Sequence, residues 1–397
     1  MKNRILFVED NPVVLQAYAL MLRPETGNWE VGTAADAASA MQMLRQQPYD
    51  VVVSDMALPG KSGLELLVEV RQRYPAVARI MVSGITDQEA VARALGTTHQ
   101  FLSKPLDPRT LRSTLSRIVG LEAYLQGKQL QELVARLRAI PSFPSLYLEL
   151  MKELQSPEPS IEKIAAIVKR DPGMTAKMLQ VVNSAAYGLP EKTGDLMQAV
   201  QFLGWSSVRS IVLSFQVFSF FERDRRLPQG FAEALWQHSL RTGDLARKIM
   251  AREHADPIGT ENACIAGMLH DIGKLMLAHN LPGQFEKALQ VSTEEKIPLH
   301  DAETRVYGAT HACVAAYLLG LWGLPAEIVE AVAFHHTPTR GNTSELSPLA
   351  AVHIANVLDR EFSGAVTGPN PSQLQMEYLE SIGLADRLET WRAELRK

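Results

Sequence analysis

Four short apolar runs in the first 105 residues each end in polar side chains that can do chemistry. ILFV leads into Glu9-Asp10, VVVS into Asp55, RIMV into Ser83 and FLS into Lys104. Apolar runs of this length, bounded by polar residues, predict buried strands. In a parallel sheet, ligands bind beyond the carboxyl ends of the strands. The polar residues are therefore expected to converge on one site at that edge.

The alternation of signals also predicts the fold of this first part. Helical stretches separate five strand-like runs, at residues 4–9, 29–34, 50–55, 79–83 and 101–103. Strands joined by crossover helices predict an α/β doubly wound, five-stranded parallel sheet of the flavodoxin type. After Pro105 the strand signals stop, and apolar residues recur at helical spacing. The rest of the chain is therefore predicted to be all-α.

The acidic residues of this predicted site favour phosphoryl chemistry. Crowded carboxylates repel one another unless a hard cation neutralises them, and Mg²⁺ prefers oxygen ligands. A carboxylate can attack phosphorus and become an acyl phosphate, whose oxygens a hydroxyl and an ammonium group can bind. The alternative is that Asp10 and Asp55 are ordinary turn residues at strand ends, since aspartate favours turns. The ordered set of polar strand ends favours the chemical interpretation.

Residues 1–120 resemble the receiver domain of two-component response regulators. The resemblance implies that Asp55 accepts a phosphoryl group from a histidine kinase. It also implies that Asp10 and Asp55 bind Mg²⁺ with the backbone carbonyl of Ala57, and that Glu9 assists through water. It rests on the loop DMALPGKSG at 55–63 and on seven residues in order: Glu9, Asp10, Asp55, Ser83, Phe101, Lys104 and Pro105.

The same resemblance implies a switch beside the phosphoacceptor. Ser83 and Lys104 would bind the phosphoryl group, and Phe101 takes the place of an aromatic side chain that changes rotamer on activation. Taken alone, Phe101 would be a plain core residue; its place three residues before Lys104 favours the switch. The Lys104-Pro105 bond is expected to be cis, which is rare outside Xaa-Pro bonds.

Length and composition limit the class of protein. A chain of 397 residues is too long for one ordinary core, so two or three domains are expected. The net charge of −4 argues against direct DNA binding. No export signal is visible, and the longest later apolar run, at 211–221, is too short for a membrane helix. We therefore expect a cytoplasmic protein, with Cys264 and Cys313 as core residues in a reducing compartment.

A helical linker is predicted at 121–139, within a longer helical tract that begins at Asp107-Pro108 and runs to about Ala139. The tract could form a short coiled-coil seam, which would permit a homodimer. Alternatively, it is an amphipathic connector packed on its own domain. Its apolar residues fall at helical spacing: Leu130, Leu133, Val134, Leu137 and Ile140.

Scattered histidines mark the helical part of the chain. An adjacent His-Asp pair, joined by histidines from other helices, can build a metal site that suits Mn²⁺, Fe or Zn²⁺. Such a metal can activate water against a phosphodiester. The candidates are His238, His270, Asp271, His311, His335 and His336.

Residues 140–397 resemble the HD superfamily, and more closely its HDOD branch of output domains. The resemblance rests on IPSFPSLYLELMKEL from Ile140, on the run from 164 to 214, and on GMLHDIGKL followed by LLGLWGLP and AFHH. It implies an HD-like helical domain that regulates through partner contacts, for which hydrolysis is not generally expected.

Two departures suggest that the HD-type site is degenerate. The HD pattern closes with an aspartate on a late helix, but the matching tract HIANVLD aligns Asn356 at that position. The related cyclic-dinucleotide phosphodiesterases carry a Gly-Tyr-Pro motif after their histidine pair, where this chain has TPTRGN; Lys274 does match their HDIGK lysine. Alternatively, His238 and His311 are core histidines bonded to backbone, and His335-His336 caps a helix C-terminus, where a cation is favoured.

The sequence thus predicts a response regulator whose receiver domain controls a non-catalytic HDOD domain through an unidentified downstream protein. The alternative is an enzyme, a receiver-regulated, metal-dependent phosphodiesterase of the HD superfamily. Its cofactors would be Mg²⁺ at the receiver site and a transition metal at the histidines. The two hypotheses differ on whether Asn356 and the absent Gly-Tyr-Pro motif leave a working site.

Overall fold

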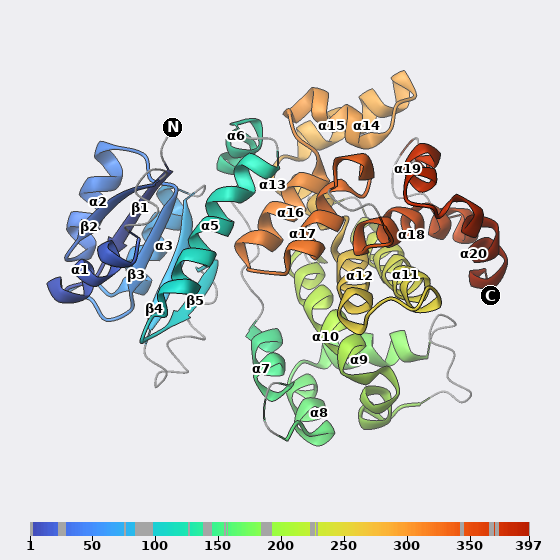
Figure 1. The fold of residues 1–397 in the computed structure, drawn as a ribbon, viewed down its shortest axis with the longest axis horizontal. Helices are drawn as coiled ribbons and strands as arrows, with labels where there is room; N and C mark the ends of the chain where they lie inside the picture. Colours follow the sequence, from blue (N-terminus) through green and yellow to red (C-terminus); the bar gives the residue numbers. More distant parts are fainter. Residues whose placement is uncertain are drawn as a thin grey trace. The chain divides into compact units, whose positions relative to one another are not determined.

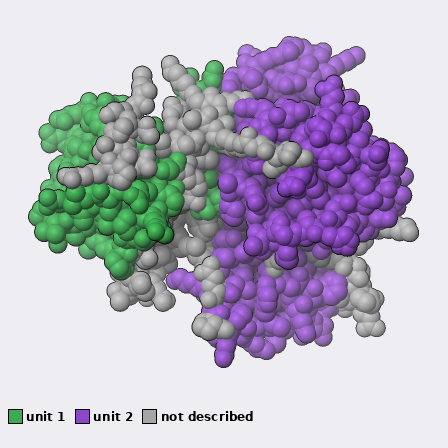
Figure 2. Space-filling view, viewed as in Figure 1, with its two compact units in different colours: residues 1–143, 317–324 green, residues 144–316, 325–397 purple. Residues whose placement is uncertain are grey.

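The computed structural model describes the chain except residues 1–2, 23–28, 75–76, 84–97, 126–127, 138–144, 155, 157, 184–192, 223–226, 228, 342–344, 365–368, 370–372 and 397. By its internal contacts the chain divides into two compact units (Figure 2). Unit 1 comprises Met1–Phe143 with Tyr317–Leu324, and unit 2 comprises Pro144–Ala316 with Pro325–Lys397. The finer domain boundaries stay a prediction.

Unit 1 contains a parallel sheet of five strands in the order β2-β1-β3-β4-β5 (Figure 1). This is the doubly wound order of flavodoxin-like folds, so the predicted fold class is confirmed. Each strand lies within one residue of its predicted position. The strands are β1 Asn3–Val8, β2 Trp29–Ala34, β3 Val51–Asp55, β4 Ala78–Ser83 and β5 Gln100–Ser103.

Helices cover the sheet, which explains why its central strands are apolar throughout. Every residue of β3 and β4 is buried, as expected for parallel strands covered on both faces. On one face, Leu6 and Val52 belong to a core shared with α2 (Ala37–Gln46) and α3 (Gly63–Arg73). Phe7 points the other way and contacts Tyr18 of α1 (Pro12–Met21), with ring centroids 5.2 Å apart.

Capping fixes where these helices begin. The Asp36 carboxylate accepts a hydrogen bond from the Ser39 amide at 2.7 Å and so caps the start of α2. Ser62 opens α3 with a capping box, because its hydroxyl accepts from the Glu65 amide while the Glu65 carboxylate accepts from the Ser62 amide.

The strand register brings the polar strand ends to one edge of the sheet. Asp55 at the end of β3 is paired with Val82, and Ser83 at the end of β4 is paired with Ser103. The Lys104 amide donates to the Ser83 carbonyl at 2.9 Å, which continues the ladder by one residue.

The tract predicted as one long helix forms two, α5 (Pro108–Tyr124) and α6 (Lys128–Arg136). Asp107 caps α5, accepting a hydrogen bond from the Thr110 amide at 2.8 Å. The apolar residues of the predicted tract are buried where the structure describes them. Leu130, Leu133 and Val134 of α6 and Leu137 just after it are at most 2% exposed, whereas Ile140 lies outside the described residues.

The described residues from 145 onward form α-helices and two short 3₁₀ turns, which confirms the all-α prediction. No helix in the described part of the chain is long and apolar enough to cross a membrane. Cys264 and Cys313 are buried and unbonded to each other, as predicted for core residues. The helices are α7 Ser145–Leu154, α8 Ile161–Lys169, α9 Pro172–Val182, α10 Leu196–Glu222, α11 Phe231–Arg252, α12 Pro257–Leu269, α13 Ile272–Asn280, α14 Pro282–Glu295, α15 Leu299–Tyr307, α16 His311–Leu321, α17 Ala326–Phe334, α18 Pro348–Ser363, α19 Met376–Ser381 and α20 Leu388–Leu395.

Candidate functional site

Lys104 lies between two carboxylates at the edge of the parallel sheet of unit 1. Its Nζ is 2.8 Å from Glu9 Oε2 and 2.9 Å from Asp55 Oδ1. Glu9 is 2% exposed and Asp55 8%. Burial acts to lower the pKa of Lys104, but the bonds to Glu9 and Asp55 outweigh it and raise that pKa. The lysine is therefore a cation held against the expected phosphoacceptor.

The acidic residues fit a hard divalent cation. Glu9, Asp10 and Asp55 each place one carboxylate oxygen within 4.8 Å of the others. Asp10 is exposed whereas its two neighbours are buried, so the group opens to solvent on one side. An all-oxygen set with room for water is what Mg²⁺ requires.

Two close contacts fix the loop that follows Asp55. A Cβ on Gly63 would lie 1.8 Å from the Asp55 carbonyl oxygen, so only glycine fits there. The Ser54 hydroxyl donates to that carbonyl at 2.9 Å. The glycine at the end of DMALPGKSG thus allows α3 to begin directly against the end of β3.

The remaining predicted receiver residues stand as follows. Ser83 is 9% exposed, and its Oγ is 3.7 Å from Met56 Sδ. Phe101 is in β5, but its side chain lies outside the described part of the structure. The Lys104-Pro105 bond is cis, as the resemblance implied.

Tyr18 also belongs to this site, although the sequence did not predict it. Burial raises the pKa of Tyr18 to about 12. The charge of Lys104 opposes this shift, and the charges of Glu9 and Asp55 add to it.

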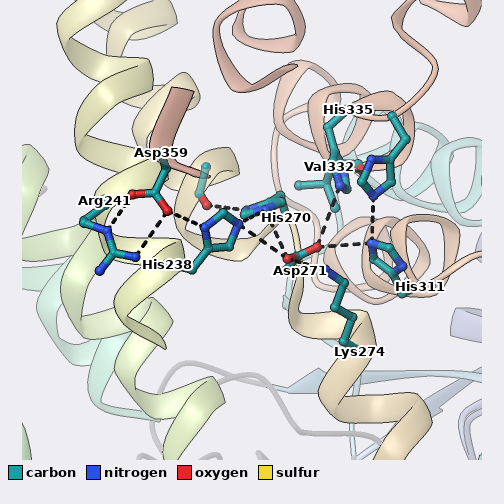
Figure 3. A network of polar contacts seen from close by, with 11 residues as sticks. His238, Arg241, His270, Asp271, Lys274, His311, Val332, His335 and Asp359 are labelled. Atoms are coloured by element: carbon teal, nitrogen blue, oxygen red, sulfur yellow. Dashed lines mark hydrogen bonds and ion pairs between the residues drawn. The ribbon is translucent and has the colours of Figure 1, made fainter. Parts of the chain in front are cut away.

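All six predicted residues of the histidine cluster come together in the helical part (Figure 3). His238 is on α11, His270 and Asp271 join α12 to α13, His311 begins α16, and His335 and His336 follow α17. His270, Asp271, His311 and His335 are each 0% exposed.

Three glycines allow the backbones to approach closely enough to build this cluster. A Cβ on Gly267 of α12 would lie 2.7 Å from the Gly243 Cα of α11. A Cβ on Gly273 would lie 1.9 Å from the His311 carbonyl oxygen. The glycine of HDIGK is therefore required for the contact that brings His311 to Asp271.

Asp271 contacts most of the cluster. Its Oδ1 is 3.1 Å from His311 Nε2 and 3.8 Å from His335 Nε2. Its Oδ2 is 3.3 Å from His270 Nε2, 3.7 Å from His238 Nε2 and 2.6 Å from Lys274 Nζ. Burial acts to raise the pKa of Asp271, but His270 and Lys274 outweigh it and hold that pKa well below its usual range.

Four of the five histidines are anchored through Nδ1. The Nδ1 atoms of His270 and His335 donate to the carbonyl oxygens of Gly267 at 2.7 Å and Val332 at 2.8 Å. Those of His238 and His311 lie 2.6 Å from carboxylate oxygens, of Asp359 and Glu303 respectively. This arrangement is typical of metal-binding imidazoles, whose other nitrogen is fixed by a carboxylate or carbonyl.

Burial disfavours protonation of three of the five rings, those of His238, His335 and His336. Burial lowers the pKa of His238 to about 4, although its bond to Asp359 opposes the shift. Burial and the neighbouring imidazoles hold the pKa of His335 and of His336 well below its usual range. Burial acts against protonation of His311, but Glu303 and the bond to Asp271 outweigh it and raise its pKa.

Sequence reasoning missed the residues that anchor the cluster. The alternative that His238 and His311 bond to backbone is wrong, because both bond to carboxylates. Glu303 and Asp359 are buried partners from α15 and α18, and Arg241 also bonds Asp359, with Nε 2.5 Å from Oδ1. Asn356 is 1% exposed, and neither of its amide atoms has a hydrogen-bond partner among the described residues.

Two family models match the chain. The model described as HDOD domain matches residues 140–338, and the one described as response regulator receiver domain matches residues 5–116.

Among similar proteins, an uncharacterised protein of Treponema pallidum is 26% identical over 258 residues, which cover 63% of this chain and 49% of the relative. The hydrogenase transcriptional regulatory protein HoxA of Cupriavidus necator is 34% identical over 125 residues, 31% of this chain and 25% of the relative. The chain thus spans at most about half the length of these relatives. A solved HDOD domain protein of unknown function from Geobacter sulfurreducens is 23% identical, with a TM-score of 0.57 over 69% of this chain and 94% of that one, which shows a shared fold.

Proposed function

Because the chain belongs to the HDOD domain family and carries a response regulator receiver domain, we propose that it is a phosphorylation-controlled response regulator. A histidine kinase supplies the phosphoryl group, Asp55 accepts it, and the HDOD domain acts through contacts with a downstream protein. The observation that carries this proposal is the position of Lys104, whose ammonium contacts both Glu9 and Asp55.

The chemistry assigns a role to each group at the sheet edge. The Asp55 carboxylate attacks phosphorus and becomes an acyl phosphate, and the donor nitrogen leaves. Mg²⁺, held by Glu9, Asp10 and Asp55, would neutralise charge on the transferred group. Lys104 is within reach of the new phosphoryl oxygens because it already contacts Asp55 Oδ1 at 2.9 Å. Ser83, at the end of the adjacent strand, would supply a hydroxyl to another phosphoryl oxygen.

Phosphorylation is expected to change hydrogen exchange in residues 145–396 through the connector α5–α6. Allosteric coupling is typically about 1–3 kcal/mol, so protection should change by about 5- to 150-fold in the affected segments. The measurement compares the wild type and Asp55→Asn, each with and without a phosphoryl donor. The wild type should respond and the variant should not.

Inserting glycines at 126–127, between α5 and α6, tests whether the phosphorylation signal reaches the HDOD domain through a stiff connector. A stiff connector predicts that the insertion keeps phosphorylation of Asp55 but removes the exchange difference in the HDOD domain. An undiminished difference would show that transmission does not depend on the connector.

A second function, metal-dependent phosphodiester hydrolysis, is favoured by the four histidines whose Nε2 atoms surround Asp271. Three observations oppose it. His270 and Asp271 are 0% exposed, so neither side chain is open to solvent. Lys274 is bonded to Asp271, and the carboxylate of the late helix, Asp359, is turned to His238 and Arg241.

We therefore expect no hydrolysis of cyclic dinucleotides by the purified chain. The assay is product formation with Mn²⁺, Fe²⁺ or Zn²⁺ added, and a variant carrying both His270→Ala and Asp271→Ala serves as the background. Metal-dependent turnover in the wild type that disappears in this variant would replace the partner-contact proposal with the enzymatic one.

A further inference from the structure

A cavity of about 880 Å³ is formed by elements of unit 2 that come late in the chain. Its walls come from α18, from the residues that begin α19, from α20, and from the junction between α14 and α15. Most of the residues that line it follow residue 338, where the match to the HDOD family ends. Ligand sites in proteins are typically cavities of about 300–1,000 Å³, so this one can hold a small molecule.

Helix α20, which forms one wall, is fastened to the end of α11. Glu253 Oε1 accepts hydrogen bonds from Arg387, in the turn before α20, with Nε at 2.9 Å and Nη2 at 2.6 Å. The same oxygen accepts from Trp391 Nε1 at 3.1 Å, and Trp391 is 0% exposed. The cavity wall is therefore part of the packed structure, and a preformed site binds its ligand at a lower cost in ordering.

The charged side chains that line the cavity neutralise one another. Arg392 of α20 donates from Nε and Nη2 to the Glu361 carboxylate, at 2.9 and 2.8 Å, and from Nη1 to Glu389 at 2.6 Å. These bonds raise the pKa of Arg392. The other lysine or arginine among the described lining residues is Lys296, which is exposed. Because the formal charges of the lining cancel, an uncharged ligand fits it better than one that brings an unpaired charge.

Two imidazoles give the cavity an aromatic surface. His300 and His336 both line it, and their rings stack with centroids 4.3 Å apart and an interplanar angle of 9°. Burial lowers the pKa of both rings, which favours their neutral forms. Nucleobases stack on the aromatic side chains of proteins, histidine included. A planar heterocycle is therefore the kind of ligand that suits this surface.

Two glutamines supply hydrogen-bonding groups. Gln375 is held in place, because its Nε2 donates to the His336 carbonyl at 3.0 Å and its backbone amide donates to His353 Nε2 at 3.1 Å. Gln373 lines the cavity two residues earlier and is exposed. A glutamine carboxamide pairs with N6 and N7 of adenine, whereas guanine is bound by arginine or lysine. With the guanidinium group of Arg392 already bound to carboxylates, the lining favours adenine.

We propose that this cavity binds the base of an uncharged adenine compound such as adenosine. The base lies against the stacked rings of His300 and His336, and the carboxamide of Gln373 pairs with its edge. The proposal is independent of phosphorylation at Asp55, because the cavity shares no residue with the receiver site. Ligand binding is then a second signal to the helical unit, received through the helices that follow the family match.

The test is a calorimetric titration of the full chain with adenosine, guanosine and AMP. Adenosine should bind at least about tenfold more tightly than guanosine, because the carboxamide matches only the adenine edge. AMP should bind no more tightly than adenosine, since Arg392 is already bound to Glu361 and Glu389. Hydrogen exchange in α20 should slow when adenosine is present.

Variants locate the ligand. Ala385→Trp places an indole in the cavity and should abolish binding. Ala234→Trp, at an exposed position on α11 outside the lining, is the matched control and should bind adenosine as the wild type does. Gln373→Leu changes an exposed side chain and should weaken adenosine binding by about 2- to 10-fold. The proposal is overturned if the wild type binds no adenosine, if guanosine or AMP binds more tightly, or if Ala385→Trp binds adenosine as well as the wild type.

Discussion

Replacing Asp271 with leucine is expected to lower the free energy of unfolding of the HDOD domain by about 3–5 kcal/mol. The substitution leaves the Lys274 ammonium buried without its carboxylate partner, 2.6 Å away in the wild type. It also removes the acceptor 3.1 Å from His311 Nε2. The measurement is urea denaturation followed by tryptophan fluorescence, since four of the five tryptophans lie after residue 200.

The pH dependence of the stability of Asp271→Leu tests whether the buried charge of Lys274 causes the loss. Burial already lowers the pKa of Lys274 in the wild type, against the opposing effect of Asp271. Without Asp271, the folded state binds that proton more weakly than the unfolded state does. The stability of Asp271→Leu should therefore rise as the pH increases towards the ordinary lysine pKa.

Two controls separate the buried pair from a general effect of losing charge. The double variant Asp271→Leu with Lys274→Met should recover much of the loss, because it removes both buried charges. Glu295→Gln, which breaks the exposed pair with Arg305, should cost less than about 1 kcal/mol. An equally small cost for Asp271→Leu would contradict the burial of a charged Lys274.

The largest expected effect at the receiver site is the loss of phosphorylation when Mg²⁺ is removed. Glu9, Asp10 and Asp55 bring their carboxylates within 4.8 Å of one another, and a phosphoryl donor adds more negative charge. Lys104 alone offers one positive charge against these three. Chelation should abolish labelling, and Asp10→Asn should slow it by at least about tenfold through the weakened metal site. Asp36→Asn, at the exposed cap of α2, should leave labelling unchanged.

The receiver fold and its site could be predicted because each signal is local. Strands covered on both faces must be apolar along their whole length, so β1, β3 and β4 stand out as runs, and the polar residue after each run marks the functional edge. Tyr18 gave no such signal, because it is placed by the packing of α1 on Phe7 and not by any motif.

The histidine cluster was predictable in its members but not in its arrangement. The pair His270-Asp271 and the four other histidines are recognisable residue types, whereas Glu303 and Asp359 are ordinary helical acids in the sequence. Only helix packing brings Asp359 of α18 to His238 of α11, 121 residues earlier. The difference between the two oxygens of Asp271 depends on side-chain direction, which no sequence pattern contains.

The connector was correctly predicted to be helical, but it was predicted as one helix and forms two, α5 and α6. Its apolar residues gave a strong helical period, and those that the structure describes are buried. The period gave no sign that α5 ends at Tyr124 and α6 begins only at Lys128. Glycine is costly inside a helix, but the two glycines of the tract, at 120 and 127, do not locate the break, because Gly120 lies within α5.

Peptide mass spectrometry of the full chain after exposure to a small acyl-phosphate donor tests whether Asp55 is the phosphoacceptor. The acyl phosphate can be trapped by borohydride reduction, which converts a phosphorylated aspartate to homoserine. We expect the wild type to be modified at Asp55 only when Mg²⁺ is present, and Asp55→Asn to remain unmodified. Undiminished phosphorylation of Asp55→Asn would contradict it, because the phosphoacceptor would then lie elsewhere in the chain.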